Sequence, residues 1–330
     1  MPFAHIKGTG SAVPERILNN AELEGMVDTT DEWIMRRTGI KERRISMLNK
    51  NESTAQMGTQ AARRAMEMAD ISADQIDIII TGTVTADRLF PSAACMIQRE
   101  LEAYNAAAYD VSAGCSGFLY ALEAGNNSIK AGMSKICLIV GAERLSTVVN
   151  WEDRGTCVLL GDGAGAVVLR SENQPGGIHS THIKSDGRLW DLLYADTGNN
   201  PPPANLEGMM PAPFHLKMEG NRLFKQAVPS MAGIAEKALA QNGLRREDIQ
   251  LVIPHQANLR ILQAVSEKLK IPMEKFFTNL QSYGNTSAAS IPLAMDEANR
   301  QGRIKKGDRI LLVSFGAGLT WGAAVLEWTL

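Results

Sequence analysis

Apolar runs of strand length alternate along the chain with longer runs that have a helical pattern. Several of the strand-like runs are apolar throughout, as expected for strands that are covered on both faces. The alternation of the two kinds of run predicts an α/β fold. The candidate strands are Ile76–Thr83, Lys135–Glu143, Ala164–Ser171, Ile249–His255, Arg309–Gly318 and Gly322–Trp328, and the candidate helices are Glu52–Ala69, Gly117–Gly132 and Asn258–Lys270.

The apolar runs repeat in the second half of the chain. "ADQIDIIITG" matches "REDIQLVIPH" in pattern, "KICLIVGAE" matches "DRILLVSFG", and about 173 positions separate the members of each pair. The repeat predicts a duplicated α/β unit, with an N-terminal half over residues 1–172 and a C-terminal half over residues 173–330.

At about the same offset, the turn that contains Cys115 corresponds to the turn that contains Asn285. His255 ends one of the candidate strands. Open α/β sheets place their sites at the C-terminal ends of strands. We therefore expect Cys115, His255 and Asn285 on strand-end loops that converge.

Composition limits the class of protein. The 330 residues are 45% hydrophobic and 21% charged, with a formal net charge of -2, so no overall field favours nucleic acid or an anionic membrane. No apolar run approaches the ~20 residues of a membrane span, and the N-terminus lacks a secretory pattern. The four cysteines form no CxxC pair, which predicts free thiols in the cytoplasm and neither a disulfide framework nor a metal site.

The stretch "DVSAGCSGF" places Cys115 between a strand-like run and a helix-like run. Gly114 permits a tight turn there, and the positive end of a helix dipole stabilises a thiolate. This setting predicts a thiol of lowered pKa that acts as a nucleophile near neutral pH. The alternative is a small buried thiol packed beside the turn. The remaining cysteines, Cys95, Cys137 and Cys157, are expected in the core.

His255 and Asn285 suggest partners for the thiol. A lone histidine at a strand end is more often a hydrogen-bonded structural residue, and Asn before Thr-Ser is often an Asx turn or a helix cap. Together with Cys115, however, they form a Cys–His–Asn set, in which two neutral hydrogen-bond donors face a thiolate. Papain-like proteases also use such a set, so composition alone does not decide the reaction.

Several long motifs in register resemble β-ketoacyl-acyl carrier protein synthase III, of the thiolase superfamily. They are "TTDEWIMRRTGIKERR", "DVSAGCSGF", "DRGTCVLLGDGAGAVVL", "IPHQANLRI", "YGNTSAAS" and "SFGAGLTWGAAVL". The resemblance implies a five-layered αβαβα fold of two similar halves and a homodimer. It also implies an acyltransferase that starts fatty acid biosynthesis, with acyl-CoA as substrate and no metal or redox cofactor.

The resemblance implies a decarboxylative Claisen condensation. An acyl-CoA, usually acetyl-CoA, acylates Cys115, and malonyl-acyl carrier protein then loses CO2 and attacks the acyl thioester. His255 and Asn285 would donate hydrogen bonds to the malonyl thioester oxygen, which gains negative charge. The backbone amides of Cys115 and Ala317 would form an oxyanion hole. Ala317 stands where the family often has glycine, and a backbone amide survives that change.

The resemblance implies roles for further residues, each of which also has an ordinary structural explanation. The implied CoA-binding residues are Trp33, Arg37, Arg154, Phe224 and Asn258. Trp33 would stack on the adenine between the two arginines, Phe224 would line the tunnel, and Asn258 would bind the pantetheine arm. Phe90 would help to close the acyl pocket of the partner subunit. Alternatively, the aromatic residues are core or interface residues, the arginines are solvated charges, and Asn258 is a helix N-cap.

An acidic carrier protein needs a basic docking site. The implied docking residues are Arg222, Lys225, Arg260 and Lys268, with Lys217 nearby. Related enzymes often carry two adjacent lysines where this chain has Glu267-Lys268, which predicts a weaker patch. The alternative is that these charges only solvate the surface.

Other functions remain open at this point. A thiolase would carry a second catalytic cysteine near the C-terminus, and an elongating condensing enzyme would carry a second histidine in place of Asn285. A specialised relative, acting in secondary metabolism or on longer acyl-CoA, would share all the motifs. A non-catalytic binding protein of the same fold would never be acylated at Cys115. A papain-like protease would carry its cysteine near the mature N-terminus.

Overall fold

The strand-like and helix-like runs of the sequence form the elements expected of them. The computed structural model describes residues 2–196 and 215–330. Its longer helices are α2 (Asp31–Thr38), α3 (Thr54–Ala69), α4 (Ala93–Leu101), α5 (Gly117–Lys130), α6 (Gly220–Gln241), α7 (Leu259–Leu269) and α9 (Ser290–Arg300). In this part of the chain, no helix is long and apolar enough to cross a membrane.

Two sheets contain most of the strands. The first has the order β1-β7-β6-β4-β5 and the second the order β11-β12-β13-β8. The strands of the first sheet are β1 (Phe3–Ala12), β4 (Ile78–Gly82), β5 (Ala107–Val111), β6 (Ile136–Arg144) and β7 (Asp162–Glu172). Those of the second are β8 (Ile178–Ser185), β11 (Leu251–Pro254), β12 (Arg309–Gly316) and β13 (Thr320–Glu327).

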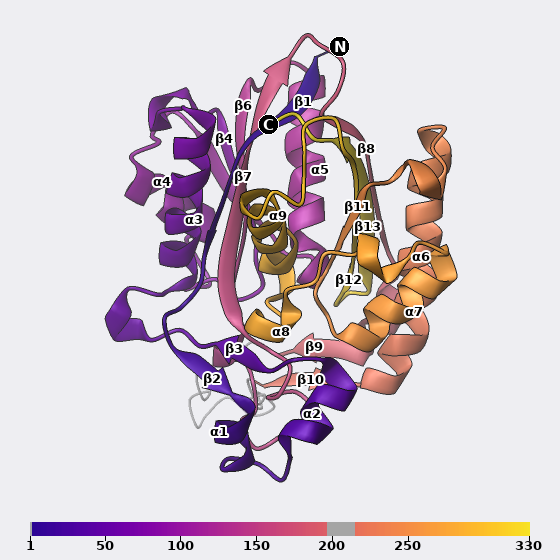
Figure 1. Cartoon of the computed structure of the whole chain (residues 1–330). Coiled ribbons are helices and arrows are strands. Elements are labelled where there is room, and N and C mark those ends of the chain that lie inside the picture. The colour runs from indigo at the N-terminus through magenta and orange to yellow at the C-terminus, as the bar shows by residue number, and fades with distance from the viewer. Residues whose placement is uncertain (1, 197–214) are drawn as a thin grey trace.

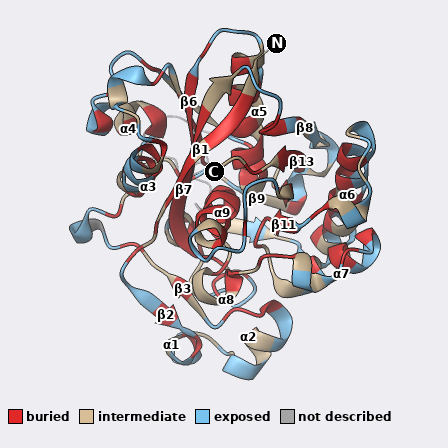
Figure 2. Cartoon of the chain, turned by 45° about the horizontal axis from the view of Figure 1, so that its top comes forward, coloured by how far each residue is buried: buried red, intermediate tan, exposed pale blue. Residues whose placement is uncertain are grey.

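The helices form three layers around these sheets, so the α/β layer arrangement expected from the sequence is confirmed. Figure 1 shows α5 and α9 between the two sheets, α3 and α4 outside the first sheet, and α6 and α7 outside the second. The middle position explains why α9 is buried along most of its length, whereas the outer helices expose one face (Figure 2). The order is therefore helix, sheet, helix, sheet, helix.

The strand pairing repeats with the spacing seen in the sequence. In the first sheet, β4 pairs in parallel with β6, and Ile78 lies opposite Cys137. In the second, β11 pairs in parallel with β12, and Leu251 lies opposite Ile310. Adding 173 to the first two numbers gives the second two. The division into halves at residue 172 stays a prediction, supported by this shared register.

The turns that precede the two central helices repeat in the same way. A 3₁₀ turn, η3 (Gly114–Ser116), leads directly into α5, and a second one, η8 (Ser287–Ala289), leads directly into α9. Adding 173 to the bounds of η3 gives the bounds of η8, so Ala288 is the counterpart of Cys115. The offset inferred from sequence is therefore right, but the position equivalent to Cys115 lies three residues beyond Asn285.

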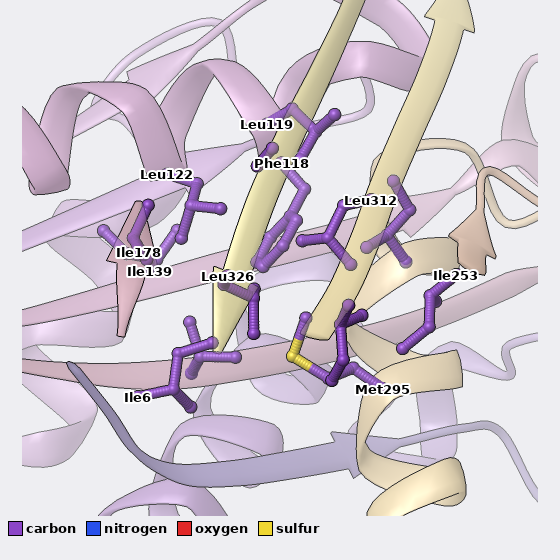
Figure 3. Packing of buried hydrophobic residues seen from close by; sticks show 14 of the residues in the cluster. Ile6, Phe118, Leu119, Leu122, Ile139, Ile178, Ile253, Met295, Leu312 and Leu326 are labelled. Atoms are coloured by element: carbon purple, nitrogen blue, oxygen red, sulfur yellow. The ribbon is translucent and has the colours of Figure 1, made fainter. Parts of the chain in front are cut away.

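The largest core lies between the sheets and joins the two halves. Figure 3 shows side chains from both halves in contact there, among them Ile6 of β1, Phe118 of α5, Met295 of α9 and Leu312 of β12. Two further cores pack α3 and α4 on the first sheet and α6 and α7 on the second. Because each sheet is packed on both faces, the positions of the central helices are fixed. The candidate site residues lie where these helices begin.

Short elements gather near the ends of β4, β6 and β11 at which the chain leaves those strands, at the bottom of Figure 1. They are β2 (Ile17–Asn19), β3 (Glu42–Arg44), β9 (Leu193–Ala195), β10 (Leu216–Met218), α1 (Asn20–Glu24) and α8 (Leu280–Tyr283). The helix α2, which carries Trp33, belongs to the same region. Open α/β sheets bind ligands at such strand ends.

Candidate active site

Cys115 lies in the turn that joins β5 to α5. The preceding Gly114 has a positive φ of 52°, and a Cβ at this position would lie 2.7 Å from the backbone nitrogen of Ala317. Both the left-handed conformation and this close approach favour glycine. The predicted strand, glycine, cysteine and helix therefore occur in that order, with Cys115 directly before the N-terminus of α5.

The predicted lowering of the Cys115 pKa is wrong. Burial raises the pKa of the thiol to about 11, and the neighbouring carboxylate of Glu143 raises it further, whereas a hydrogen bond from Ser287 lowers it. The thiol keeps partial solvent accessibility but is surrounded by protein. Loss of hydration outweighs the favourable N-terminal end of α5 because an anion without water is strongly disfavoured. A route for the thiol proton is therefore needed.

His255 follows β11 and is almost fully buried. Its backbone N–H donates to the carbonyl of Val313 on β12, at 2.8 Å. Its ring nitrogen Nδ1 lies 2.7 Å from the hydroxyl oxygen of Ser290, the first residue of α9. Burial lowers the pKa of His255 to about 3. The imidazole is therefore neutral at physiological pH.

The hydroxyl of Ser290 bears on the tautomer of the histidine. The Ser290 oxygen accepts the backbone N–H of Gln256, at 3.4 Å. The hydroxyl can donate its proton to Nδ1 of His255, and in that tautomer the ring hydrogen is on Nε2. Among the described residues, no hydrogen-bond partner of Nε2 is recorded. In this tautomer, His255 has a neutral N–H donor that is free for a ligand.

Asn285 is fixed by its backbone and by one end of its side chain. Its backbone N–H donates to Leu159, and its backbone carbonyl accepts the N–H of Gly161, at 2.8 and 3.0 Å. Its side-chain oxygen Oδ1 accepts the backbone N–H of Ser287, at 2.8 Å. This is the Asx turn that the sequence left open as an alternative. The turn engages only the oxygen, so the amide N–H groups remain available as donors.

One segment, residues 285–290, contains Asn285 and contacts the other two members of the predicted Cys–His–Asn set. Asn285 is its first residue, Ser287 is close enough to the Cys115 thiol to lower its pKa, and Ser290 hydrogen-bonds to His255. The segment η8 also packs directly on η3 and on β6. The structure therefore brings the loops of the two halves together, as the sequence analysis expected.

The loop after β12 borders the nucleophile. A Cβ on Gly316 would lie 2.4 Å from the backbone nitrogen of Cys115, so the two backbones are in direct contact. Ala317 follows at the same turn, beside Gly114. Among the backbone hydrogen bonds of the described loops and turns, none is donated by the Ala317 N–H. This amide is thus free to serve an incoming oxygen.

Trp33 and the two predicted arginines form one cluster. The guanidinium carbon of Arg37 lies 4.7 Å from the centre of the Trp33 ring, and that of Arg154 lies 5.2 Å from it. Arg154 is held by the backbone carbonyl and the carboxylate of Asp28. The structure therefore brings these three predicted residues together at the partly exposed face of α2.

Asn258 and Phe224 lie on α7 and α6. Asn258 is the N-cap of α7, since its Oδ1 accepts the backbone N–H of Ile261 at 3.0 Å. The helix-cap alternative is therefore confirmed, and its side-chain nitrogen is left over for other contacts. Phe224 is half-buried and lies outside the apolar cluster that packs α6 on the second sheet.

Phe90 and the predicted docking residues are exposed. Phe90 is 80% exposed. The basic side chains on α6 and α7 face solvent, and Arg222 forms an ion pair with Glu219 at 3.0 Å. The exposed docking residues are Lys217, Arg222, Lys225, Arg260 and Lys268.

The sequence analysis missed three residues of this site, namely Glu143, Ser287 and Ser290. Glu143 ends a buried apolar strand, which was the available signal, since charged residues are almost never fully buried without a partner. Ser287 and Ser290 stand in the quoted motif "YGNTSAAS", but nothing in that motif indicates which hydroxyl faces which residue.

Within residues 2–196 and 215–330, no group of three or more His, Cys, Asp or Glu residues is arranged to hold a metal ion. Two recorded surface cavities, of about 620 and 430 Å³, are lined mainly by residues of α3 and α4 and their loops. Neither contains a predicted site residue. The substrate tunnel therefore stays a prediction.

Two family models match separate stretches of the chain. The model described as 3-oxoacyl-[acyl-carrier-protein (ACP)] synthase III matches residues 109–187, and its C-terminal counterpart matches residues 239–328. The β-ketoacyl-[acyl-carrier-protein] synthase III of Aquifex aeolicus is 48% identical over 98% of this chain and 99% of its own. The chain belongs to the 3-oxoacyl-[acyl-carrier-protein] synthase III family.

Other relatives agree with this assignment. The synthase III of Thioalkalivibrio sulfidiphilus is 48% identical over 99% of this chain and 100% of its own length. The crystal structure of the Aquifex aeolicus synthase III superposes with a TM-score of 0.92, at 47% identity, over 98% of this chain and 100% of that one. The resemblance seen in the sequence is confirmed, and this synthase III family member is a condensing acyltransferase.

Proposed function

We propose that this synthase III transfers the acyl group of a short acyl-CoA to Cys115 and condenses it with malonyl-acyl carrier protein. CO2 leaves, and the product is a 3-oxoacyl-acyl carrier protein that starts a fatty acid. The observation that carries the proposal is the contact of one segment, residues 285–290, with Cys115 and His255. That segment also contains Asn285, so nucleophile and donors belong to one site.

His255 and Asn285 act in the decarboxylation step. Loss of CO2 from the malonyl group leaves an enolate whose thioester oxygen carries negative charge. Nε2–H of His255 and the amide N–H of Asn285 are neutral donors without a recorded partner among the described residues. One such donor is worth about 3 kcal/mol in other enzymes. Neutral donors suit this task because they stabilise the charge without supplying a readily transferred proton.

The backbone amides of Cys115 and Ala317 form the oxyanion hole for acyl transfer. Both belong to the turn contact described above, in which Gly316 lies against the Cys115 backbone. They stabilise the tetrahedral oxygen that forms when the thiolate attacks the acyl thioester, and again when the enolate attacks acyl-Cys115. The methyl group of Ala317 leaves its amide intact.

CoA binds as a substrate and no resident cofactor takes part. The adenine stacks on Trp33 between Arg37 and Arg154, whose guanidinium groups already lie over that ring. The side-chain nitrogen of Asn258 binds the pantetheine arm while its oxygen caps α7. Phe224 lines the entrance.

The carrier protein docks on the face formed by α6 and α7. These helices pack side by side and carry exposed cations. The proposed contacts are Arg222, Lys225, Arg260 and Lys268. An acidic partner is attracted to such a face even when each single charge contributes little.

The active protein is a cytoplasmic homodimer. The strand β5 lies at the edge of the first sheet with its face partly exposed, and Tyr109 on it is 41% exposed. Leu89 and Phe90 are 89% and 80% exposed nearby in the chain. An open apolar edge of this kind is normally covered. In the dimer, Phe90 closes the acyl pocket of the partner.

A specialised priming enzyme is the second candidate. The priming β-ketosynthase of the R1128 polyketide pathway superposes with a TM-score of 0.91 at 34% identity, over 99% of this chain and 96% of that one. The acyl-CoA chain length distinguishes the two functions, because the fatty-acid initiator proposed above takes a short acyl-CoA.

The test uses radiolabelled acyl-CoA of graded chain length, with malonyl-acyl carrier protein as acceptor. Cys115→Ala should abolish labelling of the protein, which a non-catalytic protein of the same fold would never show. His255→Ala and Asn285→Ala should keep the labelling and lose condensation by about 100-fold or more. Normal condensation by both variants would remove their assigned roles.

A further inference from the structure

Glu143, near the end of β6, is a fully buried carboxylate. Three of its hydrogen-bond donors belong to the loop that follows β4. They are the backbone N–H of Val84 at 3.2 Å, the hydroxyl of Thr83 at 3.3 Å, and the hydroxyl of Thr85. These donors fix the orientation of the carboxylate, and a fourth donor comes from the segment that carries Asn285.

The fourth donor is Ser287, whose hydroxyl oxygen lies 3.0 Å from Oε1 of Glu143. Ser287 is buried, and its backbone N–H donates to Oδ1 of Asn285 at 2.8 Å. One residue therefore contacts the carboxylate through its side chain and the Asn285 amide through its backbone. Because Oδ1 and the N–H groups belong to one planar amide, the position of the Ser287 N–H sets where the Asn285 donors point.

The backbone of Ser287 needs support from its surroundings. Its φ of 49° lies in the left-handed region, which is strained for a residue with a Cβ. Such a conformation persists only where the surrounding contacts enforce it. The hydrogen bond from the Ser287 hydroxyl to Glu143 is a contact of this kind. Without it, φ can relax to negative values, and the backbone N–H that holds Asn285 then turns away.

We propose that Glu143 is a positioning residue for the decarboxylation step. It holds Ser287 in the left-handed conformation, and Ser287 in turn aims the amide N–H of Asn285 at the thioester oxygen of the malonyl group. In this role Glu143 takes no proton and forms no bond to the substrate. The inference rests on the donor role proposed for Asn285 and adds the group that preorganises that donor.

The other proposed donor, His255, is held by different contacts. Its backbone N–H donates to Val313, and its ring nitrogen Nδ1 lies 2.7 Å from the Ser290 hydroxyl. Loss of the Glu143 contact should therefore misdirect one donor and leave the other in place. Removing such a donor outright slows other enzymes by about 100-fold or more, so misdirecting one should slow decarboxylation by about tenfold or more.

Two substitutions of Ser287 separate the backbone conformation from the hydroxyl itself. Both Ser287→Ala and Ser287→Gly remove the hydroxyl, and with it the influence that lowers the pKa of the nearby Cys115 thiol. Alanine keeps the Cβ that strains a φ of 49°, whereas glycine adopts this φ without strain. We expect Ser287→Ala to slow decarboxylation about tenfold or more and Ser287→Gly to recover most of the rate.

The rate is measured as CO2 release from malonyl-acyl carrier protein that is radiolabelled in its free carboxyl group, in the absence of acyl-CoA. The enolate then takes a proton from water and becomes acetyl-acyl carrier protein. No acyl group on Cys115 is required, so changes in acylation do not enter the measured rate. Ser146→Ala is the matched control, because the Ser146 hydroxyl donates to another buried carboxylate, Asp162, at 2.6 Å. It should release CO2 at the wild-type rate.

Substitutions of Glu143 test the other end of the contact. Glu143→Gln keeps an oxygen that can accept from Ser287 and should retain most of the rate. Glu143→Leu removes the acceptor and should behave like Ser287→Ala. Loss of the charge alone should thus have little effect, which separates positioning from proton transfer. If Glu143→Leu does not fold, the two Ser287 variants decide.

A double-mutant cycle shows whether Ser287 acts through Asn285. In an Asn285→Ala background, Ser287→Ala should have little further effect on CO2 release. A wild-type rate in Ser287→Ala, equal losses in Ser287→Ala and Ser287→Gly, or an undiminished Ser287→Ala effect in that background overturns the inference. If Asn285→Ala alone releases CO2 at the wild-type rate, the donor role proposed for Asn285 is rejected instead, whatever the Ser287 variants do.

Discussion

The pH dependence of folding stability tests whether His255 is neutral in the folded protein. Burial lowers the pKa of this imidazole from 6.5 to about 3. In the unfolded chain, the same group binds a proton below about pH 6.5. Protonation therefore favours the unfolded chain. The stability that depends on the neutral ring is present above pH 6.5 and is lost as the pH falls toward 3.

The size of the effect follows from the difference between the two pKa values. Below about pH 6.5 the free energy of unfolding falls by about 1.4 kcal/mol per pH unit, which amounts to about 2 kcal/mol at pH 5. Glu143 acts in the opposite direction. Its pKa is raised from 4.5 to about 7, so the folded chain gains stability as the pH falls through this range. The two effects oppose each other, and only a variant isolates the histidine.

Urea unfolding of wild type and His255→Gln at about pH 7.5, 6.5 and 5 provides the measurement. Glutamine does not titrate, so the stability difference between the two proteins should shift in favour of the variant by about 2 kcal/mol from pH 7.5 to pH 5. His215→Gln is the control, since this side chain is exposed. A difference between wild type and His255→Gln that stays constant with pH would refute the argument.

Three substitutions test the rest of the site. Gly316→Ala places a Cβ 2.4 Å from the Cys115 nitrogen and should lower the unfolding free energy by about 1–3 kcal/mol and slow acylation, as measured by urea unfolding and acyl labelling. Gly233→Ala, in open space on α6, should do neither. Asn258→Ala should remove about 1 kcal/mol of helix capping and raise KM for acyl-CoA, whereas Asn258→Ser should keep the cap and raise KM alone in the same assays. Trp33→Ala should raise KM for acyl-CoA in steady-state kinetics, whereas Trp190→Ala, at a side chain that is 58% exposed, should leave it unchanged.

Most of the fold could be predicted from the sequence because its signals are local and repeated. The buried strands of the two sheets are apolar runs, and the shared offset identified corresponding strands before any pairing was known. Cys115 and His255 were found because each follows such a run at a strand end. Both signals lie in the local sequence, so they can be recognised without the folded structure.

The electrostatics of the site could not be predicted, because they depend on contacts between distant segments. The strand–turn–helix pattern around Cys115 predicted a lowered thiol pKa, but burial among residues of both halves raises it. In the sequence, Glu143 is only the end of an apolar strand. Nothing there indicates its contact with Ser287, which lies far along the chain. The tautomer of His255 depends in the same way on Ser290. Such effects require the folded arrangement.

The duplication explains why these contacts come from a turn without a nucleophile of its own. Ala288 is the counterpart of Cys115 and is buried, with its backbone carbonyl so close to Gly141 that a Cβ there would lie 2.3 Å away. A small residue at position 288 lets the second turn pack tightly on the first sheet. That approach brings Ser287 within reach of both Glu143 and the thiol. The duplicated backbone therefore provides two helix starts. One carries the nucleophile Cys115, and the other carries Ser287, which lies beside it.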